Sequence, residues 1–185
     1  MLKVYGGPRT RADIVHWYLE ELGVPYESVA VDLQSKEQRQ PEYLAINPFG
    51  KIPSLVDGDF KRFESGAILL YLADKHGKLP RTAEERAAIT QWVIVTNATL
   101  APVLFNEQQR AEAMPSLLQP ISDLLTRQDF LVGNELSAAD VALGTALVFL
   151  QFALKVDFSA YPGIAAYVGR LSRRPAFQKA TGIGG

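Results

Sequence analysis

Strand and helix signals alternate through residues 1–77 of the chain. The apolar segment 2–5 predicts a strand that ends at Gly6-Gly7-Pro8, and apolar residues spaced three and four apart predict a helix over 11–22. The same pattern predicts the remaining elements: strands at 26–31, 52–56 and 60–63, a short helical segment reaching Ala45, and a helix at 65–75. The expected order is β-α-β-α-β-β-α.

Strand signals largely disappear after a short polar segment, 78–81, that reads as a linker. Thr82 and Glu85 have the form of a capping box and open a helix that runs through Val95. Further helices are expected at 112–126, 138–154 and 164–173. The predicted fold class is therefore α/β plus all-α. A first domain spans residues 1–77, and an all-helical bundle domain spans residues 82–185.

Composition and charge remove several classes of function. The chain has 185 residues, 48% of them hydrophobic, and a formal net charge of −1, so no basic surface is expected to neutralise a nucleic acid backbone. There is no cysteine, which removes disulfides, thiolate metal sites and redox chemistry by the protein's own thiols. The two histidines, His16 and His76, form no ligand cluster, so no metal is expected. His16 has no obvious partner and is expected to be structural.

No targeting or membrane segment is expected from the pattern. The N-terminal segment 1–5 reads as a strand and lacks the parts of a signal peptide. The apolar stretches read as shorter than a membrane span of about 20 residues. We therefore expect a soluble, cytoplasmic protein.

Three segments together resemble the glutathione transferase superfamily of the cytosolic type. They are Asn47–Pro53 before a hairpin, Glu64–Leu72 at the start of a helix, and Leu136–Ala142 late in the second domain. Each match is weak alone, but their order and spacing cover nearly the whole chain. The opening segment Tyr5–Ala12 is most similar to the chi class. The resemblance implies a thioredoxin-like first domain that binds glutathione as a co-substrate.

The resemblance also implies a cis peptide bond between Ile52 and Pro53. A cis bond would present the backbone of Ile52 to the cysteinyl backbone of glutathione, in the manner of an added strand. The alternative is an ordinary trans proline that opens an edge strand. Lys51 offers a cation for the glycyl carboxylate, or it is a solvated surface lysine.

Glu64 and Ser65 stand at a predicted helix start, where free amides and the helix dipole favour an anion. The resemblance implies that Ser65 donates to the γ-glutamyl carboxylate and that Glu64 accepts from the γ-glutamyl ammonium. Ser65 can also be a simple N-cap.

The candidates for activating the glutathione thiol lie after the first strand. Thr10 stands where phi-like enzymes carry their serine, and Arg11 stands where beta-like enzymes carry cysteine. We expect Thr10 as the hydroxyl donor and Arg11 as electrostatic helper, with Tyr5 as a further donor and Arg9 as a glutathione contact. The alternatives are that Thr10 only caps the following helix and that both arginines are solvated.

The remaining site residues are implied by the resemblance. Leu100 and Phe105 are candidates for lining a shallow second-substrate pocket between the domains, because the sequence pattern predicts abbreviated helices around 105–114. Family members form homodimers, so we expect one here. Phe49 falls where several classes place an aromatic key that enters the partner, the alternative being core packing.

The function implied is glutathione conjugation to small hydrophobic electrophiles such as isothiocyanates and activated aryl halides, with possible reduction of organic hydroperoxides. The alternative is a non-catalytic module of the same fold that binds ligands or assembles with a protein partner. A thioredoxin-like oxidoreductase is disfavoured because that chemistry needs a protein thiol, and the chain has none.

Overall fold

The computed structural model describes residues 1–183, which divide into two compact units. The first contains residues 1–76 together with the C-terminal segment from Pro175, and the second contains Gly77–Arg174. The change from one unit to the other at residues 76–77 adjoins the linker expected at 78–81. The last helix, α9 (Pro175–Thr181), was not expected from the sequence, and it packs with the first unit because it lies against α1 (Asp13–Leu22).

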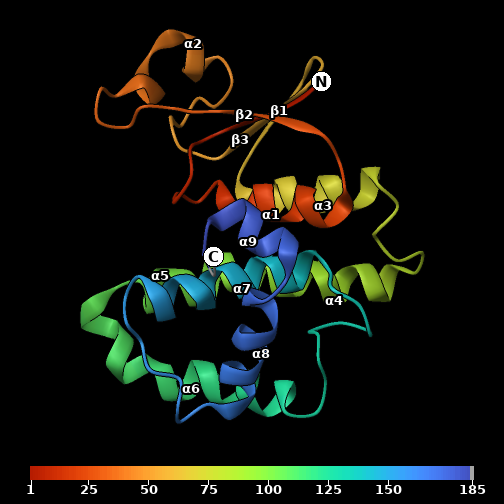
Figure 1. Ribbon diagram of the computed structural model, residues 1–185, viewed down its shortest axis with the longest axis vertical. Helices are drawn as coiled ribbons and strands as arrows, with labels where there is room; N and C mark the ends of the chain where they lie inside the picture. The colour runs from red at the N-terminus through yellow and green to blue at the C-terminus, as the bar shows by residue number, and fades with distance from the viewer. Residues whose placement is uncertain (184–185) are drawn as a thin grey trace. The chain divides into compact units, whose positions relative to one another are not determined.

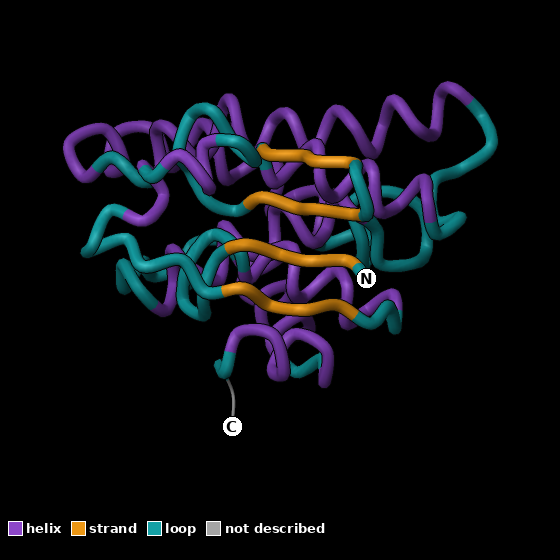
Figure 2. Tube along the Cα trace, turned by 90° about the horizontal axis from the view of Figure 1, so that it is seen from above, coloured by secondary structure: helices purple, strands orange, loops and turns teal. Residues whose placement is uncertain are grey.

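The first unit is built on a four-stranded sheet with the order β2-β1-β3-β4 (Figure 2). The strands are β1 (Leu2–Tyr5), β2 (Tyr26–Val29), β3 (Ser54–Asp57) and β4 (Phe60–Phe63). β2 runs parallel to β1, whereas β3 is antiparallel to both β1 and β4. This is the expected thioredoxin-like arrangement, although β3 begins two residues later than the pattern predicts.

Helices α1 and α3 (Ser65–Lys75) lie on one side of the sheet, while the single turn α2 (Pro41–Leu44) lies on the other (Figure 1). The alternating residues Leu2 and Val4 of β1 are buried, as are Trp17 of α1 and Leu69 of α3. Trp17 packs edge-on against Phe177 of α9 at 5.0 Å between ring centroids. The core of this unit therefore includes residues from both ends of the chain.

All regular elements of the second unit, residues 77–174, are helices. Its helices are α4 (Ala83–Ile94), the π-helical turn η2 (Val95–Leu100), α5 (Ala101–Leu104), α6 (Glu107–Leu125), α7 (Ala138–Phe152) and α8 (Pro162–Ser172). The sequence pattern predicts a helix over 112–126, but α6 begins five residues earlier, at Glu107, because the Asn106 side chain caps it by accepting from Gln108 N.

The central helix α7 begins at a buried capping box. The Ser137 hydroxyl accepts from Ala139 N at 3.2 Å, and Asp140 Oδ2 accepts from Ser137 N at 2.9 Å. Asp140 Oδ1 also accepts from Leu131 N at 2.8 Å and from the Tyr167 hydroxyl at 2.9 Å. One carboxylate thus fixes the helix start, the preceding loop and α8.

By length and composition alone, the continuous helical stretch Ala83–Leu104 could cross a bilayer, and it is longer than the apolar stretches expected from the sequence. Its buried residues include Ile89, Val93, Thr96 and Leu100, which recur every three or four positions. Burial along one side is typical of a helix that packs against the rest of a folded domain. Length alone is weak support for a membrane span.

Candidate functional site

Strand register brings three separate loops to one end of the sheet. Tyr5, the last residue of β1, pairs with Ser54 at the start of β3, and Ser54 pairs with Phe63 at the end of β4. The loop after β1, the turn before β3 and the start of α3 after β4 therefore open at the same edge. The loop after β1 lies close to the turn before β3 at Gly6. A Cβ added to Gly6 would lie 3.4 Å from Ile52 Cβ, which is a close contact between these two loops.

The turn before β3 is fixed from beneath by hydrogen bonds to one carbonyl. The Tyr43 hydroxyl and the Asn47 side-chain amide each donate to Lys51 O, both at 2.7 Å. Burial raises the pKa of Tyr43, so this hydroxyl keeps its proton. The Ile52–Pro53 bond that follows is cis, as the resemblance implies. No hydrogen bond to the backbone of Ile52 is found within residues 1–183, so its N–H and C=O are available to an extended ligand.

A second loop packs onto this turn and adds a cation. Gly50 has φ +56°, and a Cβ there would lie 2.6 Å from Gln38 O, so only glycine permits the approach. Arg39 Nη1 donates to Phe49 O at 3.2 Å. Together with the exposed Lys51, this arrangement places two basic side chains near the turn. The sequence pattern could not select Arg39 from its loop, because the contact depends on the fold.

The start of α3 combines a strained residue with an unpaired hydroxyl. Glu64 has φ +67°, an uncommon conformation for a residue other than glycine, and it occupies the N-cap position without a side-chain cap bond. Ser65 is therefore the first helical residue and not the cap. It is 3% exposed, and its hydroxyl has no hydrogen-bond partner among the described residues. With the open amides of the first turn, it forms a site suited to a carboxylate.

The loop after β1 uses the Thr10 hydroxyl internally. Thr10 Oγ1 donates to Gly7 O at 2.7 Å and accepts from Ala12 N at 3.1 Å, so the hydroxyl closes the turn before α1 and is not the N-cap of the helix, a position that Ala12 occupies. Helix α1 starts at Asp13, two residues later than expected. Arg9, with φ +60°, and Arg11 are both exposed beside Thr10.

Tyr5 belongs to a different environment from Thr10. Its ring packs edge-on against Tyr43 of α2, with 6.0 Å between centroids. The side chain is thus engaged on the face of the sheet that carries α2. This placement favours a packing role for Tyr5 over a role as thiol donor.

Two candidates for the second-substrate pocket lie in the helical unit. Leu100 is 3% exposed within η2, and its burial leaves little surface for a ligand. Phe105 is half-buried and packs edge-on against Phe149, with 5.3 Å between centroids. The sequence did not single out Phe149, whose helix reads as an ordinary core helix, yet it is 46% exposed.

Phe49 is 60% exposed and rests on Phe63, with 5.5 Å between the two ring centroids. The alternative of core packing within the protomer is therefore wrong. An exposed aromatic ring held by a second ring can serve as an anchor for a partner surface.

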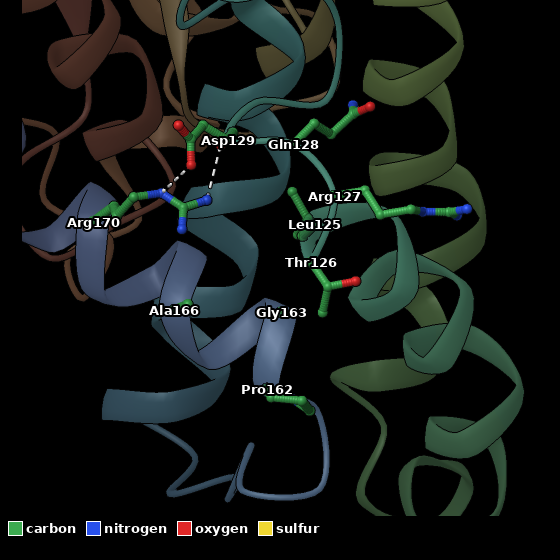
Figure 3. Close-up of a pocket in the computed structure, with 9 residues that line it drawn as sticks. All are labelled: Leu125, Thr126, Arg127, Gln128, Asp129, Pro162, Gly163, Ala166 and Arg170. Atoms are coloured by element: carbon green, nitrogen blue, oxygen red, sulfur yellow. Dashed lines mark hydrogen bonds and ion pairs between the residues drawn. The ribbon is translucent and has the colours of Figure 1, made fainter.

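A separate surface pocket of about 370 Å³ lies at the end of α6 and the start of α8 (Figure 3). Arg170 crosses its edge and binds Asp129, with Arg170 Nη2 donating to Asp129 O at 3.0 Å. None of the predicted glutathione-site residues lines it. Among residues 1–183, no three His, Asp or Glu side chains gather as they would around a metal ion.

The fold and the site define the class of thioredoxin-like proteins that carry a second, helical domain. Comparison with known families makes the assignment specific. The protein-family model described as "Glutathione S-transferase, N-terminal domain" matches residues 1–74 of the chain. The family model described as "Glutathione S-transferase, C-terminal domain" matches residues 98–170.

Individual relatives agree with this assignment. Glutathione S-transferase F10 from Arabidopsis thaliana is 40% identical over 67% of this chain and 69% of its own length. The disulfide-bond oxidoreductase YfcG from Escherichia coli is 31% identical over 95% of this chain and 92% of its own. A glutathione transferase from Burkholderia graminis, solved with two glutathione molecules per subunit, has a TM-score of 0.88 and 28% identity over 97% of this chain and 86% of that chain.

The chain therefore belongs to the glutathione S-transferase family and is a glutathione transferase. Its similarity to the chi class stays a prediction.

Proposed function

We propose that this chain binds glutathione along the edge formed by the cis-proline turn and the start of α3. The backbone of Ile52, beside Pro53, pairs with the cysteinyl residue. Ser65 and the first amides of α3 hold the γ-glutamyl carboxylate, and Glu64 accepts from the γ-glutamyl ammonium. The observation that carries this proposal is the Ser65 hydroxyl at the first turn of α3. The residue is 3% exposed, yet its hydroxyl is not among the fully buried side-chain atoms without a partner, and it makes no hydrogen bond within residues 1–183, so it is open to a ligand.

The glycyl carboxylate lies at the other end of the ligand, and basic side chains serve it there. Lys51 is exposed beside the turn, and Arg39 is tied to the same turn through Phe49 O. A guanidinium or ammonium group is suited to a carboxylate because the hydrogen bond is charge-assisted.

The thiol is activated by the loop after β1. A free thiol has a pKa of about 8.5, so stabilising the thiolate by about two pKa units needs roughly 2.7 kcal/mol. Thr10 supplies a hydroxyl, while Arg11 and Arg9 supply positive charge beside the sulfur. The thiolate then attacks the electrophilic carbon of a small hydrophobic substrate: an activated aryl halide loses its halide ion, and an isothiocyanate takes up a proton on its nitrogen.

The test is a panel of glutathione-dependent reactions with an isothiocyanate, an activated aryl halide and cumene hydroperoxide. We expect conjugation of the first two, and peroxide reduction as a slower activity. Omitting glutathione should abolish every rate. Retention on glutathione resin without turnover of any substrate would contradict the proposal and favour the alternative of a non-catalytic binding or assembly module.

We also propose a cytoplasmic homodimer, in keeping with the family. Phe49 supports this assembly because its ring is exposed and is braced by Phe63. In a two-fold symmetric dimer, each protomer would present the same ring to the other.

A second candidate function is glutathione-dependent reduction of disulfides. The relative named as a disulfide-bond oxidoreductase and the similar structure with two bound glutathiones favour it. In this reaction a glutathione thiolate attacks a disulfide R–S–S–R and releases one thiol. A second glutathione then attacks the mixed disulfide, which gives oxidised glutathione and the other thiol. This reaction uses only the thiols of glutathione, so the lack of a protein cysteine, which disfavours a thioredoxin-like oxidoreductase, does not count against it. Reduction of hydroxyethyl disulfide with glutathione tests it.

A further inference from the structure

A buried carboxylate at the start of α1 is bonded to the loop that precedes the helix. Asp13 is 8% exposed, and its Oδ2 accepts from Arg9 N at 3.0 Å. An acidic residue in the first turn commonly stabilises its own helix through the dipole. Here the hydrogen bond goes outside the helix, to a residue four positions earlier.

The residue that Asp13 holds is in an uncommon conformation. Arg9 has φ +60°, which is disfavoured for a residue with a side chain. Such a conformation persists only where the surroundings fix it. The Asp13–Arg9 bond provides this restraint, and because Thr10 follows directly, it also sets where the Thr10 hydroxyl lies.

The other carboxylate oxygen faces a histidine. Asp13 Oδ1 is buried without a hydrogen bond, and His16 Nδ1 lies 3.8 Å from it. On its far side, His16 Nε2 lies 3.2 Å from the Ser28 hydroxyl. The imidazole ring also stacks on Tyr26, with 5.3 Å between centroids and 16° between planes. The imidazole is therefore held between Ser28 and Asp13, contrary to the expectation that His16 has no partner.

This arrangement can fix the histidine tautomer. When the Ser28 hydroxyl donates to Nε2, the ring proton is on Nδ1 and points toward Asp13. Ser28 is then hydrogen-bonded to His16, and the His16 Nδ1–H faces Asp13 Oδ1 across 3.8 Å as an electrostatic contact. Asp13 Oδ2 in turn accepts from Arg9 N–H. We infer that Asp13, oriented by His16, is a positioning residue that holds the thiol-activating loop of this enzyme. This inference rests on the proposed role of that loop.

Three variants of the full chain test the inference. Asp13→Ala removes the acceptor. Asp13→Asn keeps it, since the amide oxygen can accept from Arg9 N while its amino group donates to His16 Nδ1. The histidine then donates from Nε2 to the Ser28 hydroxyl, which can accept as well as donate. Asp57→Asn is the matched control. Asp57 lies in the β3–β4 hairpin, accepts hydrogen bonds from Tyr71 and Lys75 of α3, and makes no contact with the loop after β1.

Two measurements are made on each variant. The first is amide hydrogen exchange of the segment 6–12 by mass spectrometry, without any ligand. Asp13→Ala should speed exchange in this segment by about tenfold or more, since the bond to a charged group is lost. Asp13→Asn should restore most of the protection, and the control should match wild type.

The second measurement separates kcat from glutathione affinity. A displacement of about 1 Å in a catalytic loop costs about 100-fold in rate, so Asp13→Ala should lower kcat by about 10- to 100-fold. The glutathione Kd should change by less than about threefold, because the proposed contacts to the ligand's backbone and carboxylates lie mainly on other loops, whereas this loop serves the sulfur. A variant that merely folds poorly would instead lose both kcat and glutathione affinity. Asp13→Asn should recover most of the rate.

The outcomes are distinguishable. An active wild type with unchanged kcat and exchange in Asp13→Ala overturns the inference and leaves the proposed function standing. Equal losses in Asp13→Ala and Asp13→Asn also overturn it. A wild type without glutathione-dependent turnover refutes the proposed function, and unchanged exchange in Asp13→Ala would then refute the loop anchor independently.

Discussion

The Thr10 hydroxyl donates its only proton to Gly7 O at 2.7 Å. To serve a thiolate, it must turn away from that carbonyl. A neutral hydrogen bond contributes about 0.5–1.5 kcal/mol and one to a charged group about 1.5–3 kcal/mol, so the net gain is about 1 kcal/mol. This is less than the roughly 2.7 kcal/mol that a two-unit lowering of the thiol pKa requires. Thr10 therefore shares the task with nearby positive charge or backbone amides.

Replacing Thr10 by alanine should raise the apparent pKa of bound glutathione by about 0.5–1 unit, because the thiolate loses a donor worth about 1 kcal/mol net. The rate near pH 6.5 should fall, and it should approach the wild-type rate at pH values well above both pKa values. The measurement is the pH dependence of kcat at saturating glutathione. Thr10→Ser should behave like wild type, as should Thr126→Ala, whose hydroxyl bonds Asp123 O in the other unit. An identical profile in Thr10→Ala would exclude the hydroxyl.

The Ser65 hydroxyl should contribute directly to glutathione binding. Its loss in Ser65→Ala should cost about 1–3 kcal/mol if it donates to a carboxylate, which corresponds to about 5- to 150-fold in Kd. Isothermal titration calorimetry measures this. Ser116→Ala, on the exposed surface of α6, is the control and should leave Kd unchanged. An affinity that Ser65→Ala does not alter would remove Ser65 from the site.

The Asp140 carboxylate should be among the most sensitive positions for stability. Asp140→Ala leaves the N–H groups of Leu131 and Ser137 and the Tyr167 hydroxyl without their buried acceptor. We expect a loss of about 3–5 kcal/mol in the free energy of unfolding, measured by urea denaturation. Asp123→Ala, on the exposed side of α6, should change it by less than about 0.5 kcal/mol. Similar midpoints for the two variants would contradict the structural role.

Phe49 should govern association if the chain forms the proposed dimer. Phe49→Ala removes an exposed ring that rests on Phe63, and the sedimentation coefficient should shift toward that of the monomer at micromolar concentration. Phe152→Ala removes another exposed ring, 44% accessible, from the end of α7 and serves as control. A wild type that is already monomeric would refute the dimer itself.

The hairpin carboxylate Asp57 should contribute to acid sensitivity. Hydrogen bonds from Lys75 and Tyr71 hold its pKa below the usual value. A lowered folded-state pKa gives stability that is present above the unfolded pKa of about 3.9 and is lost as pH falls through the folded pKa. Asp57→Asn should therefore flatten the fall in stability below about pH 4, as followed by thermal melting. An unchanged slope would show that the ion pair does not hold in solution.

Local signals predicted the elements that local chemistry determines. The capping box at Ser137 and Asp140 and the glycine-proline breaks set helix boundaries through contacts within a few residues. The Ile52–Pro53 turn and the start of α3 were recognised because their motifs are contiguous. No sequence pattern predicted the positive φ angles at Arg9 and Glu64, because that conformation is normally expected at glycine.

The contacts that could not be predicted from the sequence depend on packing between residues that are far apart in the chain. Arg39 reaches the cis-proline turn only because Gly50 admits its loop, and His16 meets Ser28 only because β2 pairs with β1 beneath α1. The helix at 175–181 contains the apolar residue Phe177. Nothing local indicated that Phe177 would pack against Trp17.

The return of α9 to the first unit bears on how the chain matures during synthesis. Trp17 is fully buried, and Phe177, which covers one edge of its ring, is translated 160 positions later. Lys179 likewise reaches Glu20 of α1 at 2.7 Å. The amino-terminal core can therefore close completely only when the segment Pro175–Thr181 has left the ribosome, so the segment made first is completed late in synthesis.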